Sequence, residues 1–271
     1  MAMNQPKYEP LVSRFQASGV TAIILMGSYA RGDAGPFSDV DLVRFKSNEE
    51  EIPGSGTHLI DGFFVVVSDV SPSQVDTWFT NPEEATECIA GLRTARPLWD
   101  PEGYFKAIQK RASEFVWNSS LQDKANAYAG SQMVGWIEEV QKGLEGLRRG
   151  DEGRMLNAKH GFTWGMTRIM RVYRGVLISG DNASYTEVAQ SMGTDSEWAV
   201  LSRRAFGLEP IPLAEQIRAG LRLYALTFEM LADNLRPEDK ELIAEAVKRI
   251  RDELSPDTGN LDDDCKRRHH D

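Results

Sequence analysis

The chain has 271 residues, of which 41% are hydrophobic and 27% are charged, so it can bury a core as a globular protein does. No apolar run approaches the ~20 residues that a membrane-spanning helix needs, and no membrane partner is expected. The formal net charge of −10 disfavours nucleic acid as a partner, because non-specific binding depends on Lys and Arg at the phosphates, and it is compatible with a cationic small molecule.

The first ten residues and the cysteine content predict a cytoplasmic protein. The segment MAMNQPKYEP has no basic flank followed by an apolar core, so it does not have the pattern of a secretory signal. The two cysteines, Cys88 and Cys265, are far apart and have no metal-binding partners near them in the sequence. A reducing compartment is the simplest interpretation.

The first hundred residues alternate between helix and strand patterns. Thr21 to Met26 is an apolar run typical of a buried strand, and the run around FFVVV is strongly β-branched. In chain order, the expected elements are a helix over 7–17, strands over 21–26, 39–45 and 59–70, a helix over 71–79 with Pro72 in its first turn, and a short strand over 96–99.

After about residue 100, the apolar residues recur at three- and four-residue spacing, which predicts a helical bundle. Ser184 and Glu187 have the spacing of a capping box and predict a short helix that ends at Met192. The fold class is therefore α+β, with an N-terminal mixed sheet flanked by helices and a C-terminal bundle. The predicted divisions are 1–100 for the first domain, 101–254 for the bundle and 255–271 for a polar, mobile tail.

Two aspartates, Asp39 and Asp41, stand at the start of the second predicted strand. Residues two apart in a strand point to the same face, so these carboxylates repel one another unless a cation lies between them. Mg²⁺ prefers oxygen ligands and commonly takes one or two carboxylates together with water and phosphate oxygens. Gly27 and Ser28, just upstream, suit a close approach of backbone N–H groups to an anion. An anion-binding turn beside a cation site predicts binding of a nucleoside triphosphate.

These residues belong to a longer pattern of a buried strand, a Gly–Ser pair, a spacer and an acidic pair. The pattern reads Gly27, Ser28, Tyr29, Ala30, Arg31, Gly32 and Asp33, followed by Ser38, Asp39, Val40, Asp41 and Leu42. It resembles the nucleotidyltransferase superfamily, which includes DNA polymerase β and the antibiotic nucleotidyltransferases. The order of elements to about residue 100 and the helical second half also resemble the aminoglycoside and lincosamide nucleotidyltransferases.

The resemblance implies roles for these residues. Gly27, Ser28 and the nearby backbone would bind the β- and γ-phosphates, and Arg31 would contact the triphosphate. Asp39 and Asp41 would hold one or two Mg²⁺ ions at the α-phosphate and the acceptor hydroxyl. The first domain, 1–100, would then be the catalytic domain.

The superfamily normally supplies a third carboxylate from a nearby strand, and here its identity is open. Asp69 is the first choice, as a third catalytic acid, because it follows the apolar run of the third predicted strand. Asp61 is the second choice, although beside Gly62 it fits a hairpin turn better. Otherwise no third acid exists in this domain, and the base comes from the helical half, or activity is weak or absent. Glu138 and Glu139 in that half are candidates for contact with the acceptor.

The expected function is Mg²⁺-dependent transfer of a nucleoside monophosphate, AMP from ATP, to a hydroxyl of a small molecule. An aminoglycoside or lincosamide antibiotic is the acceptor class that the resemblance implies, which would make the protein an antibiotic-resistance enzyme. Two alternatives stay open: adenylylation of a protein or a tRNA, as in toxin–antitoxin nucleotidyltransferases, and a nucleotide-binding module without catalysis. The sequence does not predict the oligomeric state.

Overall fold

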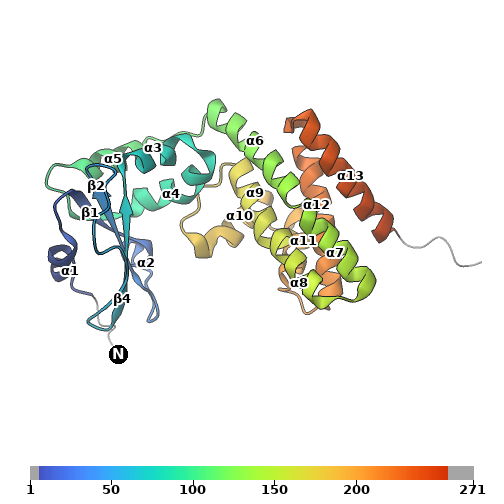
Figure 1. Ribbon diagram of the computed structural model, residues 1–271, viewed down its shortest axis with the longest axis horizontal. Helices are drawn as coiled ribbons and strands as arrows, with labels where there is room; N and C mark the ends of the chain where they lie inside the picture. The colour runs from blue at the N-terminus through green and yellow to red at the C-terminus, as the bar shows by residue number, and fades with distance from the viewer. Residues whose placement is uncertain (1–5, 256–271) are drawn as a thin grey trace, which may run out of the picture. The chain divides into compact units, whose positions relative to one another are not determined.

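The computed structural model describes residues 6–255, which pack as two compact units (Figure 1). Unit 1 contains the described residues up to Tyr128 and returns for Met170–Ser191, and unit 2 contains Ala129–Ile169 and the described residues from Met192 onward. This grouping differs from a division at residue 100, because the segment 170–191 rejoins unit 1. All of the predicted tail except Ser255 lies outside the described residues. Within 6–255, no helix is both long and apolar enough to cross a membrane.

Unit 1 is built on a five-stranded mixed sheet with the strand order β3-β4-β2-β1-β5. The β2–β4 pair is parallel, and the other neighbouring strands are antiparallel. Its elements through the sheet are α1 (Tyr8–Phe15), β1 (Val20–Met26), α2 (Gly27–Arg31), β2 (Val40–Lys46), β3 (Gly56–Ile60), β4 (Phe63–Val70), α3 (Pro72–Thr80), α4 (Pro82–Thr94), β5 (Arg96–Trp99) and α5 (Tyr104–Ser113). The mixed sheet followed by a mostly helical region confirms the predicted fold class.

The two faces of the sheet bury different cores, because alternate strand residues point to opposite faces. Ala22, Ile24 and Phe45 lie on the face covered by α3, α4 and α5 (Figure 1). Ile23 and Leu42 lie on the other face, which packs against α1. Successive residues of β1 or β2 therefore face different cores and different helices.

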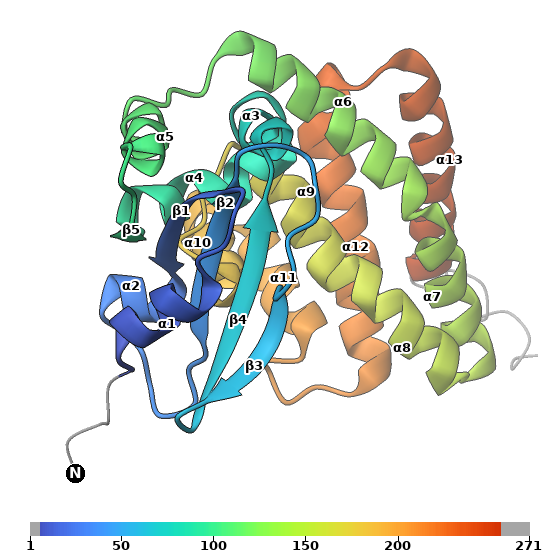
Figure 2. The same ribbon diagram turned by 60° about the vertical axis from the view of Figure 1, so that its left-hand side comes forward.

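The region predicted as one strand over 59–70 is a hairpin of two strands, β3 and β4 (Figure 2). The chain reverses at Asp61 and Gly62, whose φ angles are +51° and +85°. Two consecutive residues with positive φ form the tight turn whose twist matches antiparallel strands, and Asp-Gly is a favoured pair there. The expectation that Asp61 belongs to a hairpin turn is confirmed, and the single long strand was wrong.

Unit 2 is helical and packs around α12 (Leu213–Leu231), which contacts α7 (Ile137–Arg149), α8 (Glu152–His160) and α13 (Pro237–Leu254). A π-helical turn, η1 (Gly161–Gly165), joins α8 to α9 (Met166–Tyr173). The remaining elements are the second half of α6 (Ser119–Gly135), α11 (Glu197–Phe206) and the 3-10 turn η3 (Ala232–Asn234). The Tyr224 hydroxyl donates to the Met133 carbonyl over 2.8 Å inside this core.

The segment that rejoins unit 1 is held there by backbone and side-chain contacts. The N–H of Ile178, a residue only 1% exposed, donates to the Thr86 carbonyl of α4 over 2.9 Å. Arg171 forms an ion pair with Glu87 on the same helix. After the 3-10 turn η2 (Asp181–Ala183), α10 runs over Ser184–Met192, so the predicted helix is present, although Ser184 lies within the helix and Glu187 accepts from Ser179 instead of closing a capping box. These contacts fix the segment 178–181 beside α4.

Candidate active site

Asp41 lies in β2, in the middle of the sheet, and Asp39 lies just before that strand begins. Asp41 is half-buried and Asp39 is exposed. On either side of Asp41, the register places Met26 at the end of β1 and Val66 on β4. The residue beside Asp41 on β4, the nearby strand from which a third acid was expected, is thus an apolar valine.

Gly27 follows β1 directly and touches Asp41. Its φ angle is +65°, a conformation that side-chain-bearing residues rarely adopt. A Cβ on Gly27 would overlap Oδ2 of Asp41 and lie 3.2 Å from its Cγ. Ser28 is in the first turn of α2, one residue further on. Glycine at position 27 therefore lets the chain turn into α2 with the Asp41 carboxylate lying against its backbone.

We expect Gly27→Ala to lower the affinity for Mg²⁺ and nucleotide at least tenfold, because the added methyl displaces the Asp41 carboxylate. Gly32→Ala is a matched control: Gly32 also has a positive φ, +85°, but a Cβ there would meet nothing within 4 Å. Both variants carry backbone strain of about 1 kcal/mol or more, so thermal melting should show similar losses of stability. Isothermal titration with Mg²⁺ and a nonhydrolysable ATP analogue should separate them, and equal affinities would contradict this account.

The environment of Asp41 raises the pKa of its carboxyl to about 6. The largest cause is burial, and the next is the neighbouring negative charge of Asp39. The charge of Arg31 lowers the pKa, and the charge of Asp181, the smallest of the four contributions, adds to the rise. Three carboxylates and one guanidinium therefore act on one another here, and the excess negative charge favours a cation.

Asp181 is a site residue that sequence reasoning missed. It lies in η2, on the segment that returns to unit 1 far along the chain. Arg31 fixes this segment, because its Nη1 donates to the Ser179 carbonyl over 3.1 Å while its Nε donates to Asp33 over 3.2 Å. Ser179 is held in turn by the Glu187 carboxylate, which accepts from its N–H and its hydroxyl. Only the contact of 178–181 with α2 and α4 brings Asp181 into electrostatic reach of Asp41.

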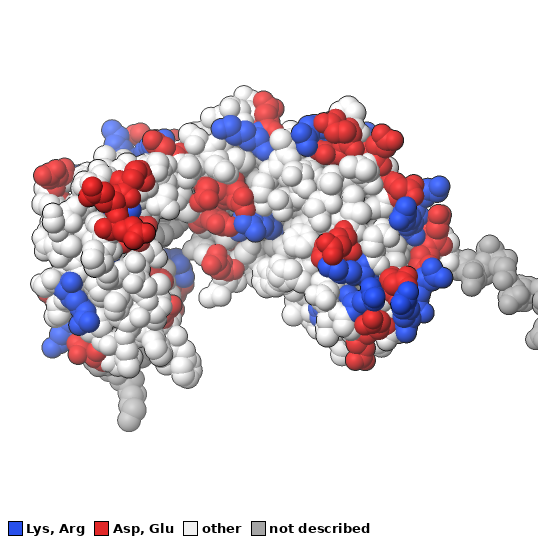
Figure 3. Space-filling model, in the orientation of Figure 1, with Lys and Arg blue, Asp and Glu red and all other residues white. Residues whose placement is uncertain are grey.

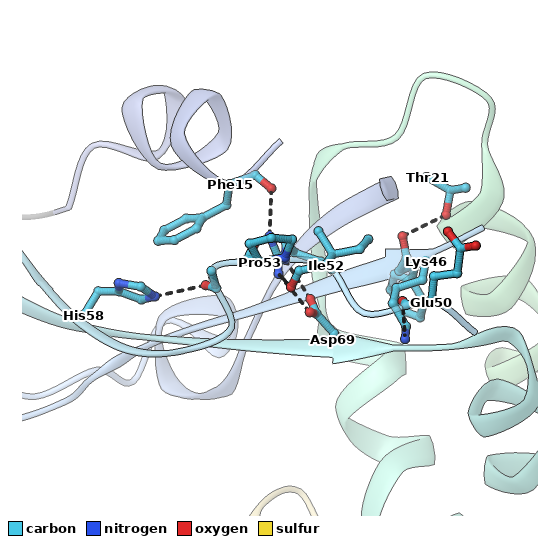
Figure 4. A network of polar contacts seen from close by, with 11 residues as sticks. Phe15, Thr21, Lys46, Glu50, Ile52, Pro53, His58 and Asp69 are labelled. Atoms are coloured by element: carbon cyan, nitrogen blue, oxygen red, sulfur yellow. Dashed lines mark hydrogen bonds and ion pairs between the residues drawn. The ribbon is translucent and has the colours of Figure 1, made fainter. Parts of the chain in front are cut away.

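Asp69 does not join this group. It is the register partner of Arg44, and Arg44 is three residues from Asp41 on β2, so the side chains of Asp69 and Asp41 leave opposite faces of the sheet. The Asp69 carboxylate is bound by the Arg44 guanidinium at 2.7 and 2.8 Å (Figure 4). The geometry argues against Asp69 as a third catalytic acid, since its carboxylate balances a buried cation on the far face.

The other acidic candidates are also elsewhere. Asp61 is exposed at the tip of the β3–β4 hairpin. Glu138 and Glu139 lie in unit 2, where both form ion pairs with Lys142 in the first turns of α7. We assign none of these three carboxylates to the Asp39–Asp41 site.

The residues present fit a divalent cation that also binds a ligand. Among residues 6–255, no group of three or more His, Cys, Asp and Glu side chains could hold a metal ion. Asp39 and Asp41 would thus supply two carboxylates, the number that Mg²⁺ commonly takes when phosphate and water complete its shell. Because Gly27 has no side chain, the Asp41 carboxylate lies directly against the backbone of the turn.

Without metal, we expect Asp41→Asn to raise the free energy of unfolding at pH 7.5 by about 1–2 kcal/mol. The folded-state pKa of about 6 exceeds the ordinary 3.8, so the aspartate destabilises the fold increasingly as pH rises from about 4 to 6, and constantly above that range. The amide removes this penalty, and the gain should disappear at pH 4. Urea denaturation in EDTA measures it, with Asp61→Asn as the control. No gain at pH 7.5 would contradict the raised pKa.

Comparisons with known proteins are consistent with this geometry. The family model of the nucleotidyltransferase domain matches residues 9–96. Among solved structures, the chain is similar to a nucleotidyltransferase-like protein from Exiguobacterium sibiricum 255-15, with 12% identity and a TM-score of 0.50 over 89% of this chain and 78% of that one. At that identity the likeness shows the fold. No curated protein matches the chain.

Proposed function

We propose that this protein transfers a nucleoside monophosphate, AMP from ATP, to a hydroxyl group of a small molecule, because residues 9–96 match the family model of the nucleotidyltransferase domain. The observation that carries the proposal is the pair Asp39 and Asp41 beside the Gly27 turn, with more negative charge than Arg31 balances. Such a site fits a divalent cation with a polyphosphate, and an aminoglycoside or lincosamide antibiotic is the acceptor class suggested by the sequence pattern.

Each residue has a role in this proposal. Asp39 and Asp41 would hold Mg²⁺, which would neutralise charge on the reacting phosphate and on the leaving pyrophosphate. The backbone at Gly27 and Ser28 binds the terminal phosphates, and Arg31 adds a positive charge next to them. The acceptor oxygen forms a bond to the α-phosphorus while the bond from that phosphorus to the α–β bridging oxygen breaks. Pyrophosphate leaves, and the hydroxyl proton is lost to solvent.

The acceptor is proposed to be a small molecule rather than a nucleic acid. On the face shown in Figure 3, Lys and Arg side chains are interspersed with Asp and Glu on both units and form no continuous basic stripe. The formal charge of −10 agrees with this distribution. A tRNA acceptor would need positive charge along its phosphates.

Val66 beside Asp41 favours a second candidate function, a nucleotide-binding module without catalysis. Both candidates predict that Mg²⁺ and ATP bind and stabilise unit 1. Only the enzyme predicts release of pyrophosphate when an acceptor is added.

The test is release of labelled pyrophosphate from ATP with Mg²⁺ and a panel of aminoglycosides, lincosamides and simpler alcohols. We expect acceptor-dependent release that EDTA abolishes. Asp76→Asn, which removes an exposed carboxylate on α3 away from the site, is the matched control and should react as the wild type does. Nucleotide binding without release for any acceptor would leave the binding module as the function.

A further inference from the structure

An exposed apolar strip leads across the sheet to the acidic pair. Leu59 on β3 and Phe64 on β4 are register partners, and they are 69% and 63% exposed. Val66 lies two residues after Phe64, so its side chain leaves the same face. Val66 is in turn the register partner of Asp41. We name Leu59, Phe64 and Val66 the apolar strip.

The apolar strip and the Gly27 turn lie on opposite sides of β2. In the strand order β3-β4-β2-β1-β5, the turn follows β1 on one side of Asp41, and the strip occupies β4 and β3 on the other. Met26, the last residue before the turn, and Val66 of the strip are the two cross-strand neighbours of Asp41. Figure 2 shows the hairpin that carries the strip extending from the sheet.

The geometry of phosphoryl transfer determines from which side of Asp41 the acceptor and the nucleotide approach. In phosphoryl displacement, the attacking and leaving oxygens are roughly in line through the phosphorus. If the terminal phosphates lie at Gly27 and Ser28, the leaving oxygen is on the β1 side of Asp41. The attacking hydroxyl then comes from the side of β4 and β3, over the apolar strip. This step rests on the proposed function.

We propose that the acceptor carries an apolar ring or alkyl group that lies on the apolar strip while its hydroxyl lies at Asp39 and Asp41. Large exposed apolar side chains that adjoin one another are a surface where a ligand gains affinity by excluding water. A small alcohol without such a group would gain no affinity from the apolar strip. This narrows the acceptor class of the proposed function to amphipathic alcohols and argues against a uniformly polar aminoglycoside as the acceptor.

Phenyl β-glucoside and methyl β-glucoside are matched probes, because they share their hydroxyls and differ in the apolar group. We expect phenyl β-glucoside to shift the methyl NMR signals of Leu59 and Val66 in protein saturated with Mg²⁺ and a nonhydrolysable ATP analogue. Methyl β-glucoside should bind about tenfold or more weakly, and Phe64→Thr should remove the difference. Threonine suits an exposed strand position. Val116→Thr replaces another exposed apolar residue and should leave the difference in affinity between the two probes unchanged.

Three results would overturn the proposal. One is equal binding of the two probes to the wild type. Another is a shift of the Leu59 and Val66 signals on addition of the ATP analogue alone, because the strip would then hold the nucleobase. The third is a change of these signals with protein concentration, because a second copy of the chain would then cover the strip. Pyrophosphate release is a separate readout. Its absence with every acceptor counts against the proposed function, whereas binding of the two probes tests whether the apolar strip binds the acceptor's apolar group.

Discussion

Replacing Arg44 by methionine is expected to lower the free energy of unfolding by about 3–5 kcal/mol. The Arg44 side chain is 1% exposed, and its guanidinium binds both carboxylate oxygens of Asp69 (Figure 4). It also donates to the carbonyls of Ile52 at 3.2 Å, Pro53 at 3.0 Å and Phe15 at 3.4 Å. Methionine fills similar space but leaves the partly buried Asp69 carboxylate, 15% exposed, without its cation and three carbonyls without their donor.

Urea denaturation at pH 7 measures this effect, and a double variant tests its cause. Arg44→Met combined with Asp69→Leu should recover much of the loss, because both charges are removed together. Arg251→Met breaks the exposed ion pair with Glu229 and should cost less than about 1 kcal/mol. If Arg44→Met unfolded at the same urea concentration as the wild type, the buried pair would have no measurable role in stability.

Asp41→Asn is expected to reduce pyrophosphate release by about 1000-fold or more while leaving the protein folded. The amide keeps the shape of the side chain but removes one of the two charges proposed to hold Mg²⁺. Asp39→Asn should have a comparable effect. Asp181→Asn should reduce the rate by only about tenfold, because Asp181 has a smaller electrostatic effect on Asp41 than Asp39 has and is not proposed as a metal ligand.

Two measurements check this ranking of the three variants by loss of rate. Initial rates at saturating ATP give the loss in each variant, and thermal melting with and without Mg²⁺ shows whether the ion still stabilises the fold. The wild type should gain stability from Mg²⁺ with the ATP analogue, and Asp41→Asn should gain much less. A rate for Asp41→Asn within tenfold of the wild type would remove this carboxylate from the proposed site.

The parts of unit 1 that follow from contiguous sequence were predicted well. The strand β1 and the turn at Gly27 lie within one short stretch, so local pattern suffices for them, while the role of Asp39 and Asp41 stays a prediction. The helix α10 was predicted from the capping-box spacing of Ser184 and Glu187, although Glu187 binds Ser179 in the structure. The helix α4 was not among the expected elements, although Asn81, Pro82 and two glutamates are the start signals of a helix.

The positions of Asp69 and Asp181 could not be predicted from the sequence. Whether Asp69 shares a face with Asp41 depends on the register between β4 and β2, and a shift of one residue reverses the answer. The hairpin at Asp61 and Gly62 also sets where β4 begins. Asp181 reaches the site through contacts of its segment with Arg31 and α4, residues far away in the sequence, and no local pattern in the sequence predicts them.

The return of residues 170–191 to unit 1 bears on how the chain is made. A ribosome has already released α7 and α8 before Ile178 and Asp181 emerge, so the first unit stays incomplete through much of synthesis. The contact of Ile178 with Thr86 on α4 closes a long loop of chain, and contacts between residues far apart in the sequence form slowly during folding. A fragment cut at residue 100 would lack Ile178 and its contact with α4, and a fragment cut at residue 191 would leave α7 and α8 without α12, so neither cut gives a complete unit.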